Sequence, residues 1–206
     1  MILAARSAAR GVHVNLQSIV CGADSIMRGL LNPPFPPADE GALRCEVGAE
    51  LPPGVIFLGD QAAGPCNQNL HVGSPAVSPV TGGSWRVQDA AFALPGWQAL
   101  FNPTLFLMLV GINNLVDGET PATVAARLIA FRAMRSNIVL CGLTKTTIPG
   151  LQALVDQTNA LFKPDARTDL INIATVDGIH PDAASSRLLA PPAHQAIMKR
   201  AFLLAA

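Results

Sequence analysis

The run Thr-Leu-Phe-Leu-Met-Leu-Val at residues 104–110 constrains the fold of this chain more than any other feature. Every residue after Thr104 is apolar, so a strand formed here buries both of its faces. Strands of that kind occupy the centre of parallel sheets, which helices cover on both sides. The run therefore predicts an α/β fold built around a buried parallel sheet.

Further short apolar stretches alternate with helical patterns along the chain. Strands are expected at residues 14–21, 55–58, 138–143 and 170–173. Helices are expected at 42–51, 86–100, 148–162 and 192–204, with a break or an end near Pro95-Gly96 in the second of them. Another helix should begin at Thr120-Pro121, with Thr120 as N-cap. The alternation predicts a three-layer α/β/α sandwich with a central parallel five-stranded sheet, in one domain spanning residues 1–206.

The composition excludes several classes of function. The 206 residues carry no net charge, and only 14% of them are charged, which argues against nucleic acid as a partner. No apolar run is long enough to span a membrane. The cysteines at 21, 45, 66 and 141 lack metal-binding spacing. Cys21 and Cys141 lie in apolar runs, whereas a disulfide between Cys45 and Cys66 stays open, as do the compartment and the oligomeric state.

Polar residues follow three of the predicted strands, at the edge where an open α/β sheet binds its ligands. Ser25 follows the first strand, Asn113 the central strand, and Asp177 to His180 the last. Serine needs a base to act as a nucleophile, and His180 can accept its proton. Asp177 can reach the other ring nitrogen of His180 and fix its tautomer, while the Asn113 amide can donate to an oxyanion. Each motif alone has a structural interpretation: a helix cap at Asp24-Ser25, a turn at residues 111–114, and a structural histidine at 180.

Together these motifs resemble the SGNH (GDSL-type) hydrolases, which are serine esterases and lipases on a flavodoxin-like fold. The matching stretches are Gly-Ala-Asp-Ser-Ile-Met-Arg-Gly at 22–29, Val-Gly-Ile-Asn-Asn-Leu at 110–115 and Asp-Gly-Ile-His-Pro at 177–181. The resemblance implies Ser25 as nucleophile, His180 as base and Asp177 as the residue that orients it. It implies no metal and no cofactor.

A finer similarity points to the carbohydrate acetylesterase branch of that family, which includes acetyl xylan esterases. It rests on Val-Ile-Phe-Leu-Gly at 55–59, Gly64-Pro65, Ser-Trp-Arg-Val at 84–87, Gly96-Trp97 and Asn102-Pro103. The resemblance implies an oxyanion hole made of the Ser25 backbone N–H, the Asn113 side chain and a backbone N–H at the start of the family's second block, which is the stretch at 84–87. Ser84 is preferred for that third donor, Gly83 is a close alternative, and Gly73 is a rival. Trp85, Asp24 and Ile179 are the residues expected near the substrate, although packing is the favoured role of Trp85.

Three positions depart from the family pattern. Ala23 and Ser84 stand where glycine is usual, and Asn114 replaces an Asp whose charge would help hold the first block, residues 22–29. These changes leave the three catalytic candidates in place. The expected function is hydrolysis of short acyl esters of carbohydrates, most simply acetyl esters, through an acyl-enzyme. A broad short-chain esterase, lipase or thioesterase, and a weakly active or non-catalytic carbohydrate-binding relative, stay open as alternatives.

Overall fold

One parallel sheet forms the centre of the computed structural model, which describes residues 16–28, 43–60, 70, 72–73, 80 and 84–205. Within these residues the sheet has four strands in the order β2-β1-β3-β4. The strands are β1 (Ser18–Ala23), β2 (Ile56–Leu58), β3 (Leu105–Leu109) and β4 (Ile138–Leu140). Residues 14 and 15 of the first predicted strand lie outside the described part of the chain.

Strand β3 lies inside the sheet, as its apolar run predicts. All of its residues are buried, and it pairs in parallel with β1 on one side and β4 on the other. Ala23 pairs with Leu109, so the last residues of β1 and β3 are in register. This register brings the carboxyl ends of the two strands to one place at the edge of the sheet.

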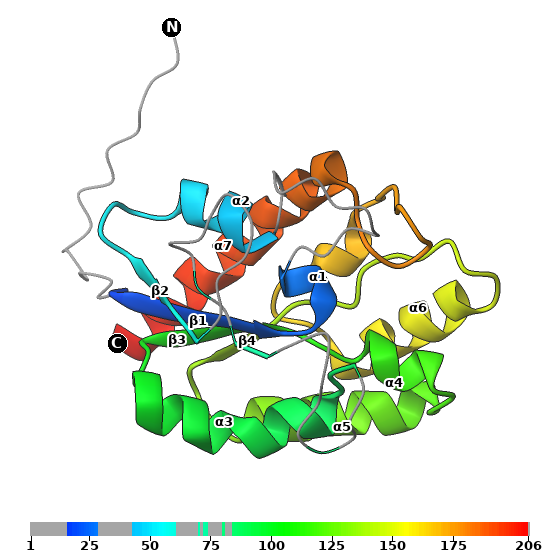
Figure 1. The fold of residues 1–206 in the computed structure, drawn as a ribbon, viewed down its shortest axis with the longest axis horizontal. Coiled ribbons are helices and arrows are strands. Elements are labelled where there is room, and N and C mark those ends of the chain that lie inside the picture. The colour runs from blue at the N-terminus through cyan, green and yellow to red at the C-terminus, as the bar shows by residue number, and fades with distance from the viewer. Residues whose placement is uncertain are drawn as a thin grey trace, which may run out of the picture.

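Helices cover both faces of the sheet, which confirms the predicted α/β/α sandwich (Figure 1). Helices α2 (Leu43–Glu50) and α7 (Ala183–Ala205) pack together on one face. Helices α3 (Val87–Phe101) and α5 (Pro121–Ala133) cover the other face, and α6 (Leu151–Phe162) packs against α5. The short helices α1 (Ser25–Arg28) and α4 (Ile112–Val116) directly follow the carboxyl ends of β1 and β3.

Two helices continue through proline residues at which the sequence predicts a break, an end or a start. Helix α3 continues through Pro95-Gly96, so the expected break is wrong. Pro95 is exposed, and water can bind the backbone carbonyl one turn earlier that proline leaves without a donor. Helix α7 likewise begins at Ala183 and runs through Pro191 and Pro192, well before its predicted start.

The predicted fifth strand at 170–173 is not present as a strand. Residues Thr168–Leu170 form a 3₁₀ turn instead, and the described chain beside β4 keeps only the single parallel bridge between Cys141 and Ala166. The backbone N–H of Thr168 donates to the carbonyl of Ala166, at 2.9 Å, and turns the chain away from the sheet. The ladder therefore ends after one pair, and the sheet of the described residues has four strands rather than five.

The cysteines divide into two kinds. Cys21 and Cys141 are free and buried, and burial raises the pKa of the Cys21 thiol to about 12, although the charge of Arg44 acts in the opposite direction. Cys45 is disulfide-bonded, and Cys66, with which the sequence left a disulfide open, lies outside the described residues. Among the helices that the structure describes, none is long and apolar enough to cross a membrane.

The N-cap of α5 gives a direct test of this local structure. The Thr120 side chain accepts a hydrogen bond from the backbone N–H of Thr123, as predicted from the Thr-Pro start. Thr120→Ala should lower the free energy of unfolding by about 1 kcal/mol, because that N–H loses its acceptor. Thr120→Ser keeps the hydroxyl and should stay close to the parent chain. Urea denaturation followed by circular dichroism measures both, and equal stabilities would refute the capping role.

Candidate active site

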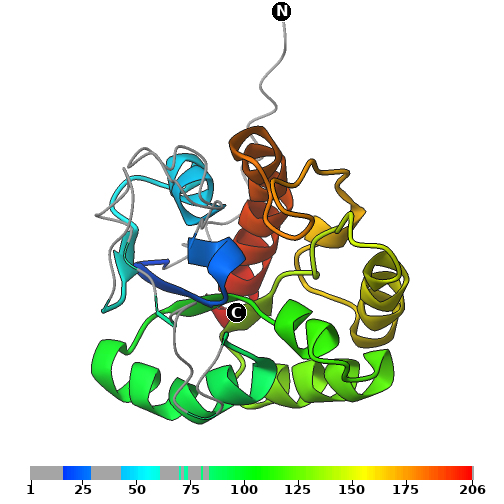
Figure 2. The ribbon, with the colours of Figure 1, turned by 45° about the vertical axis from the view of Figure 1, so that its right-hand side comes forward.

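Ser25 lies where β1 ends. It is the first residue of α1, two positions after the last residue of β1, and it is half-buried. The backbone N–H of Asp24 donates to the carbonyl of Leu109, at 3.3 Å, and so ties the end of β1 to the end of β3. Figure 2 shows α1 on the same side of the sheet as the loop that leads into α7.

That loop carries Asp177 and His180. The Asp177 carboxylate uses Oδ1 to accept from the backbone N–H groups of Ile179, at 2.9 Å, and His180, at 2.8 Å. Its Oδ2 lies 2.6 Å from Nδ1 of His180. A three-residue spacing is enough for these contacts because the aspartate closes a tight turn onto its own backbone. The turn therefore fixes the orientation of the imidazole ring.

The hydroxyl of Ser25 and the ring of His180 meet although 155 positions separate them. Ser25 Oγ lies 2.6 Å from Nε2 of His180, which completes a chain of hydrogen bonds from hydroxyl to imidazole to carboxylate. Partial burial of Asp177 works against its charge. The backbone N–H and ring of His180, with the N–H of Ile179, outweigh that effect and hold the pKa of the carboxyl below its ordinary value. The carboxylate is therefore charged where it faces the ring.

Asn113 and the segments that contain two of the other candidate oxyanion donors, Ser84 and Gly73, contact residues at this edge or in β1. Asn113, in α4, donates its side-chain amide to the backbone carbonyl of Trp85, at 2.8 Å. Ser84 directly precedes that carbonyl, so the Asn113 side chain holds the segment that contains this candidate donor. The rival Gly73 follows Val72, whose backbone N–H donates to the carbonyl of Cys21 in β1. Gly83 lies outside the described residues.

Two of the residues expected near the substrate are buried. The ring of Trp85 stacks on Trp97 with centroids 5.3 Å apart, in the packing role that the sequence favours, and leaves little surface for a sugar. Asp24 is 2% exposed, and its Oδ1 accepts from the backbone N–H groups of Ile26 and Met27 at the start of α1. Ile179 is half-buried and packs against the core beside His180.

The contacts that hold the His180 loop come from residues outside every sequence motif. The carbonyl of Gly178 accepts from the Thr147 backbone N–H, at 2.9 Å, and from the Thr146 hydroxyl. The backbone N–H of Val176 donates to the carbonyl of His180, at 2.9 Å. No motif marks Thr146 or Thr147 in the sequence, because their role depends on where the loop after β4 meets a segment thirty residues later.

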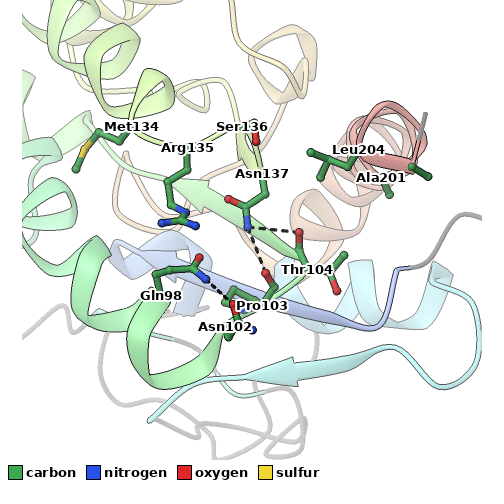
Figure 3. A pocket seen from close by; sticks show the side chains of 11 residues that line it. Gln98, Asn102, Pro103, Thr104, Met134, Arg135, Ser136, Asn137, Ala201 and Leu204 are labelled. Carbon is green, nitrogen blue, oxygen red and sulfur yellow. Dashed lines mark hydrogen bonds between the residues drawn. The ribbon is translucent and has the colours of Figure 1, made fainter.

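A polar cavity of about 640 Å³ lies elsewhere, at the amino end of the strands (Figure 3). Thr104, which precedes β3, and Asn137, which precedes β4, line it, and the Asn137 amide donates to the carbonyls of Pro103 and Thr104. None of the candidate catalytic residues lines this cavity. Across the described residues there is also no group of three or more His, Cys, Asp or Glu side chains arranged to hold a metal.

Comparison with solved structures shows the same architecture in esterases. A family 3 carbohydrate esterase of Clostridium thermocellum superposes with a TM-score of 0.61 at 18% identity, covering 93% of this chain and all of that one. A lipolytic G-D-S-L family member of Veillonella parvula gives 0.59 at 18% identity, covering 86% of this chain and 96% of that one. A family 3 carbohydrate esterase of Talaromyces cellulolyticus gives 0.61 at 15%, covering 89% and 97%.

The fold is that of the SGNH (GDSL-type) hydrolases. This agrees with the architecture that the sequence motifs predict. No protein-family model and no curated protein sequence matches the chain. At these sequence identities the likeness establishes the fold alone.

The buried carboxyl of Asp24 predicts how stability depends on pH. Burial raises its pKa from 3.8 to about 7, although hydrogen bonds from Met27 and Ile26 favour the charged form. Between these values the folded chain holds a proton that the unfolded chain releases, so this contribution to stability falls as the pH rises from about 4 to 7. The slope is at most about 1.4 kcal/mol per pH unit.

Asp24→Asn should remove this slope, because the amide keeps the Oδ1 acceptor and cannot ionise. Relative to the parent chain, the variant should therefore gain stability at pH 8 compared with pH 5. Denaturation curves at both pH values measure the difference. Parallel pH profiles of the two proteins would show that Asp24 is already charged in the folded state at pH 5.

Proposed function

We propose that this protein is a serine esterase that removes short acyl groups, most simply acetyl, from carbohydrate alcohols. The single observation that carries the proposal is the hydrogen-bonded chain Ser25–His180–Asp177, with both contacts to the ring at 2.6 Å. A hydroxyl is a weak nucleophile alone and becomes reactive when a base within hydrogen-bond reach accepts its proton. The preference for carbohydrate alcohols rests on the fold shared with carbohydrate esterases, and the preference for acetyl groups rests on the resemblance of the sequence motifs to the carbohydrate acetylesterase branch.

The reaction begins at the Ser25 hydroxyl. Oγ attacks the ester carbonyl while Nε2 of His180 takes the proton, and the charged Asp177 stabilises the imidazolium that forms. The carbonyl oxygen becomes an oxyanion, for which the Ser25 backbone N–H, the Ser84 N–H and the Asn113 amide are the proposed donors. His180 then protonates the leaving alcohol, and the acyl group stays on Ser25.

Water completes the cycle at the same groups. His180 takes a proton from water as the oxygen attacks the acyl-enzyme, and a second oxyanion forms in the same position. Its collapse releases the carboxylic acid and returns the proton from His180 to Ser25. The imidazole of His180 thus accepts and returns each proton that leaves Ser25 or water, and none of these reaction steps requires a metal ion.

Loss of the nucleophile tests the proposal directly. Ser25→Ala should lower the rate of hydrolysis of nitrophenyl acetate and of acetylated xylan by several orders of magnitude, while the circular dichroism spectrum stays unchanged. The matched control is Ser136→Ala, at the amino end of the strands, which should hydrolyse both esters like the parent chain. A fluorophosphonate should label the parent at Ser25, as peptide mass spectrometry would show, and should leave Ser25→Ala unlabelled.

The outcomes separate the alternatives. Hydrolysis of octanoyl esters as fast as acetyl esters would favour a broad esterase or lipase, to which the lipolytic neighbour of the fold gives some weight. Binding of acetylated xylan without labelling or hydrolysis would favour a non-catalytic carbohydrate-binding protein. An active Ser25→Ala variant would refute the nucleophile itself.

The Asn113 amide gives a second, graded prediction. Asn113→Ala should lower kcat roughly 100- to 1000-fold with a much smaller change in KM, because the donor acts on charge that develops in the transition state. The variant also removes the hydrogen bond to the Trp85 carbonyl, so unfolding curves should accompany the kinetics. An unchanged kcat in a folded variant would exclude Asn113 from the oxyanion hole.

A further inference from the structure

Asn114 is a fully buried polar side chain with every strong hydrogen-bonding group in use. It is 0% exposed, and its Oδ1 accepts from the backbone N–H of Val87, the first residue of α3, at 3.0 Å. Its amide donates to Oε1 of Gln88, at 2.9 Å, and to Oε1 of Glu119, at 2.8 Å. Both donors and one acceptor therefore have partners, which is the condition under which a buried amide is stable.

Glu119 is itself held from two sides. The Nε of Arg127, in α5, donates to its Oε2 at 3.0 Å, and the backbone N–H of Glu119 donates to the carbonyl of Asn114 at 3.0 Å. The side chain of Glu119 is only 23% exposed. Its position next to Asn114 is therefore fixed by contacts on both the side chain and the backbone.

This network ends at the segment that precedes α3. Asn114 holds the N–H of Val87, Asn113 holds the carbonyl of Trp85, and Arg86 between them forms an ion pair with Asp117. The candidate oxyanion donor Ser84 comes one residue before Trp85. Adjacent residues of α4 thus fix the second block and the Asn113 amide relative to each other.

We propose that the Asn114 amide and the Glu119 carboxylate are a positioning pair. Their hydrogen bond fixes the start of α3, and with it the proposed oxyanion donors at Ser84 and Asn113. The pair acts through Val87 and Trp85 on the Asn113 amide and touches no reacting atom. The inference rests on the proposed esterase function. The family pattern relates residue 114 to the first block, whereas these contacts connect Asn114 to Val87 in the second block and to Glu119.

The order of amide and carboxylate matters for a simple electrostatic reason. A carboxylate at 114 could still accept from Val87, but it would offer no proton to Glu119 or Gln88. Two carboxylates would then face each other across a hydrogen-bond distance in a buried site, which disfavours the charged form of one of them. Repulsion between residues 114 and 119 would shift the start of α3, and with it the carbonyl that orients Asn113.

The test exchanges the two groups. Asn114→Asp should lower kcat for nitrophenyl acetate at least about tenfold with KM changed less than about twofold, and should slow fluorophosphonate labelling of Ser25 to the same extent. Adding Glu119→Gln supplies a donor opposite the new carboxylate. The double variant should recover kcat and the labelling rate to within about threefold of the parent chain, because the hydrogen bond is restored with donor and acceptor reversed.

Glu46→Gln is the matched control. Glu46 is 24% exposed and pairs with Arg187, at 3.3 Å, so it resembles Glu119 in exposure and partner but lies outside the network. It should leave kcat and labelling unchanged. Circular dichroism and urea denaturation of all variants would establish that each is folded at the assay temperature.

Three results would overturn the inference, and they can be told apart. Normal kcat in Asn114→Asp, with an active parent chain, would refute the positioning role and leave the esterase proposal intact. A defect that Glu119→Gln does not rescue would show that residue 114 acts without its partner. A folded parent chain that neither hydrolyses esters nor reacts with fluorophosphonate would refute the proposed function, and this role in turnover with it.

Discussion

The pairing of β1 with β3 is the constraint on which the candidate site depends. Ala23 and Leu109 are in register at the ends of the two strands, and the N–H of Asp24 extends this pairing by one more hydrogen bond. Ser25 and Asn113 follow directly, each at the start of a short helix. A shift of register by one residue would turn the apolar side chains of β3 to the opposite faces and separate these two groups.

The loops at this edge are held by individual hydrogen bonds from side chains and from backbone N–H groups, and not by strand pairing within the sheet. The fifth strand is reduced to one bridge, so the loop that carries His180 cannot take its position from the sheet. Within the loop, the Asp177 carboxylate accepts a hydrogen bond from the backbone N–H of His180. From the loop after β4, the backbone N–H of Thr147 and the hydroxyl of Thr146 donate to the carbonyl of Gly178. The same carboxylate that orients the imidazole therefore also shapes the backbone that presents it.

The sequence predicts what is local or fully apolar, and misses what depends on distant partners. β3, the Thr120 cap and the place of Ser25 after β1 follow from short patterns, as does the contact of Asp177 with His180 three residues later. The sequence places His180 after a strand at 170–173 that the structure lacks, so the contact of His180 with Ser25 depends on the turn at Asp177 and on the neighbouring loop. The continuity of α3 through Pro95 depends on exposure of one helix face, which no local pattern shows. The loss of the fifth strand depends on a turn at Thr168 that competes with pairing. In both cases tertiary context overrides local preference.

The two carboxyl groups around Ser25 show how environment separates residues of one chemical type. Hydrogen bonds from His180 and Ile179 keep the pKa of Asp177 low despite partial burial, whereas burial raises that of Asp24 to about 7. Opposite shifts of this kind mark which of two acids carries charge during a reaction. The charged carboxylate of Asp177 lies beside the ring of His180, where it would stabilise an imidazolium. Asp24 therefore holds a proton in the folded chain at pH values where an ordinary aspartate is charged, whereas the charge of Asp177 lies on the side of the imidazole that faces away from Ser25.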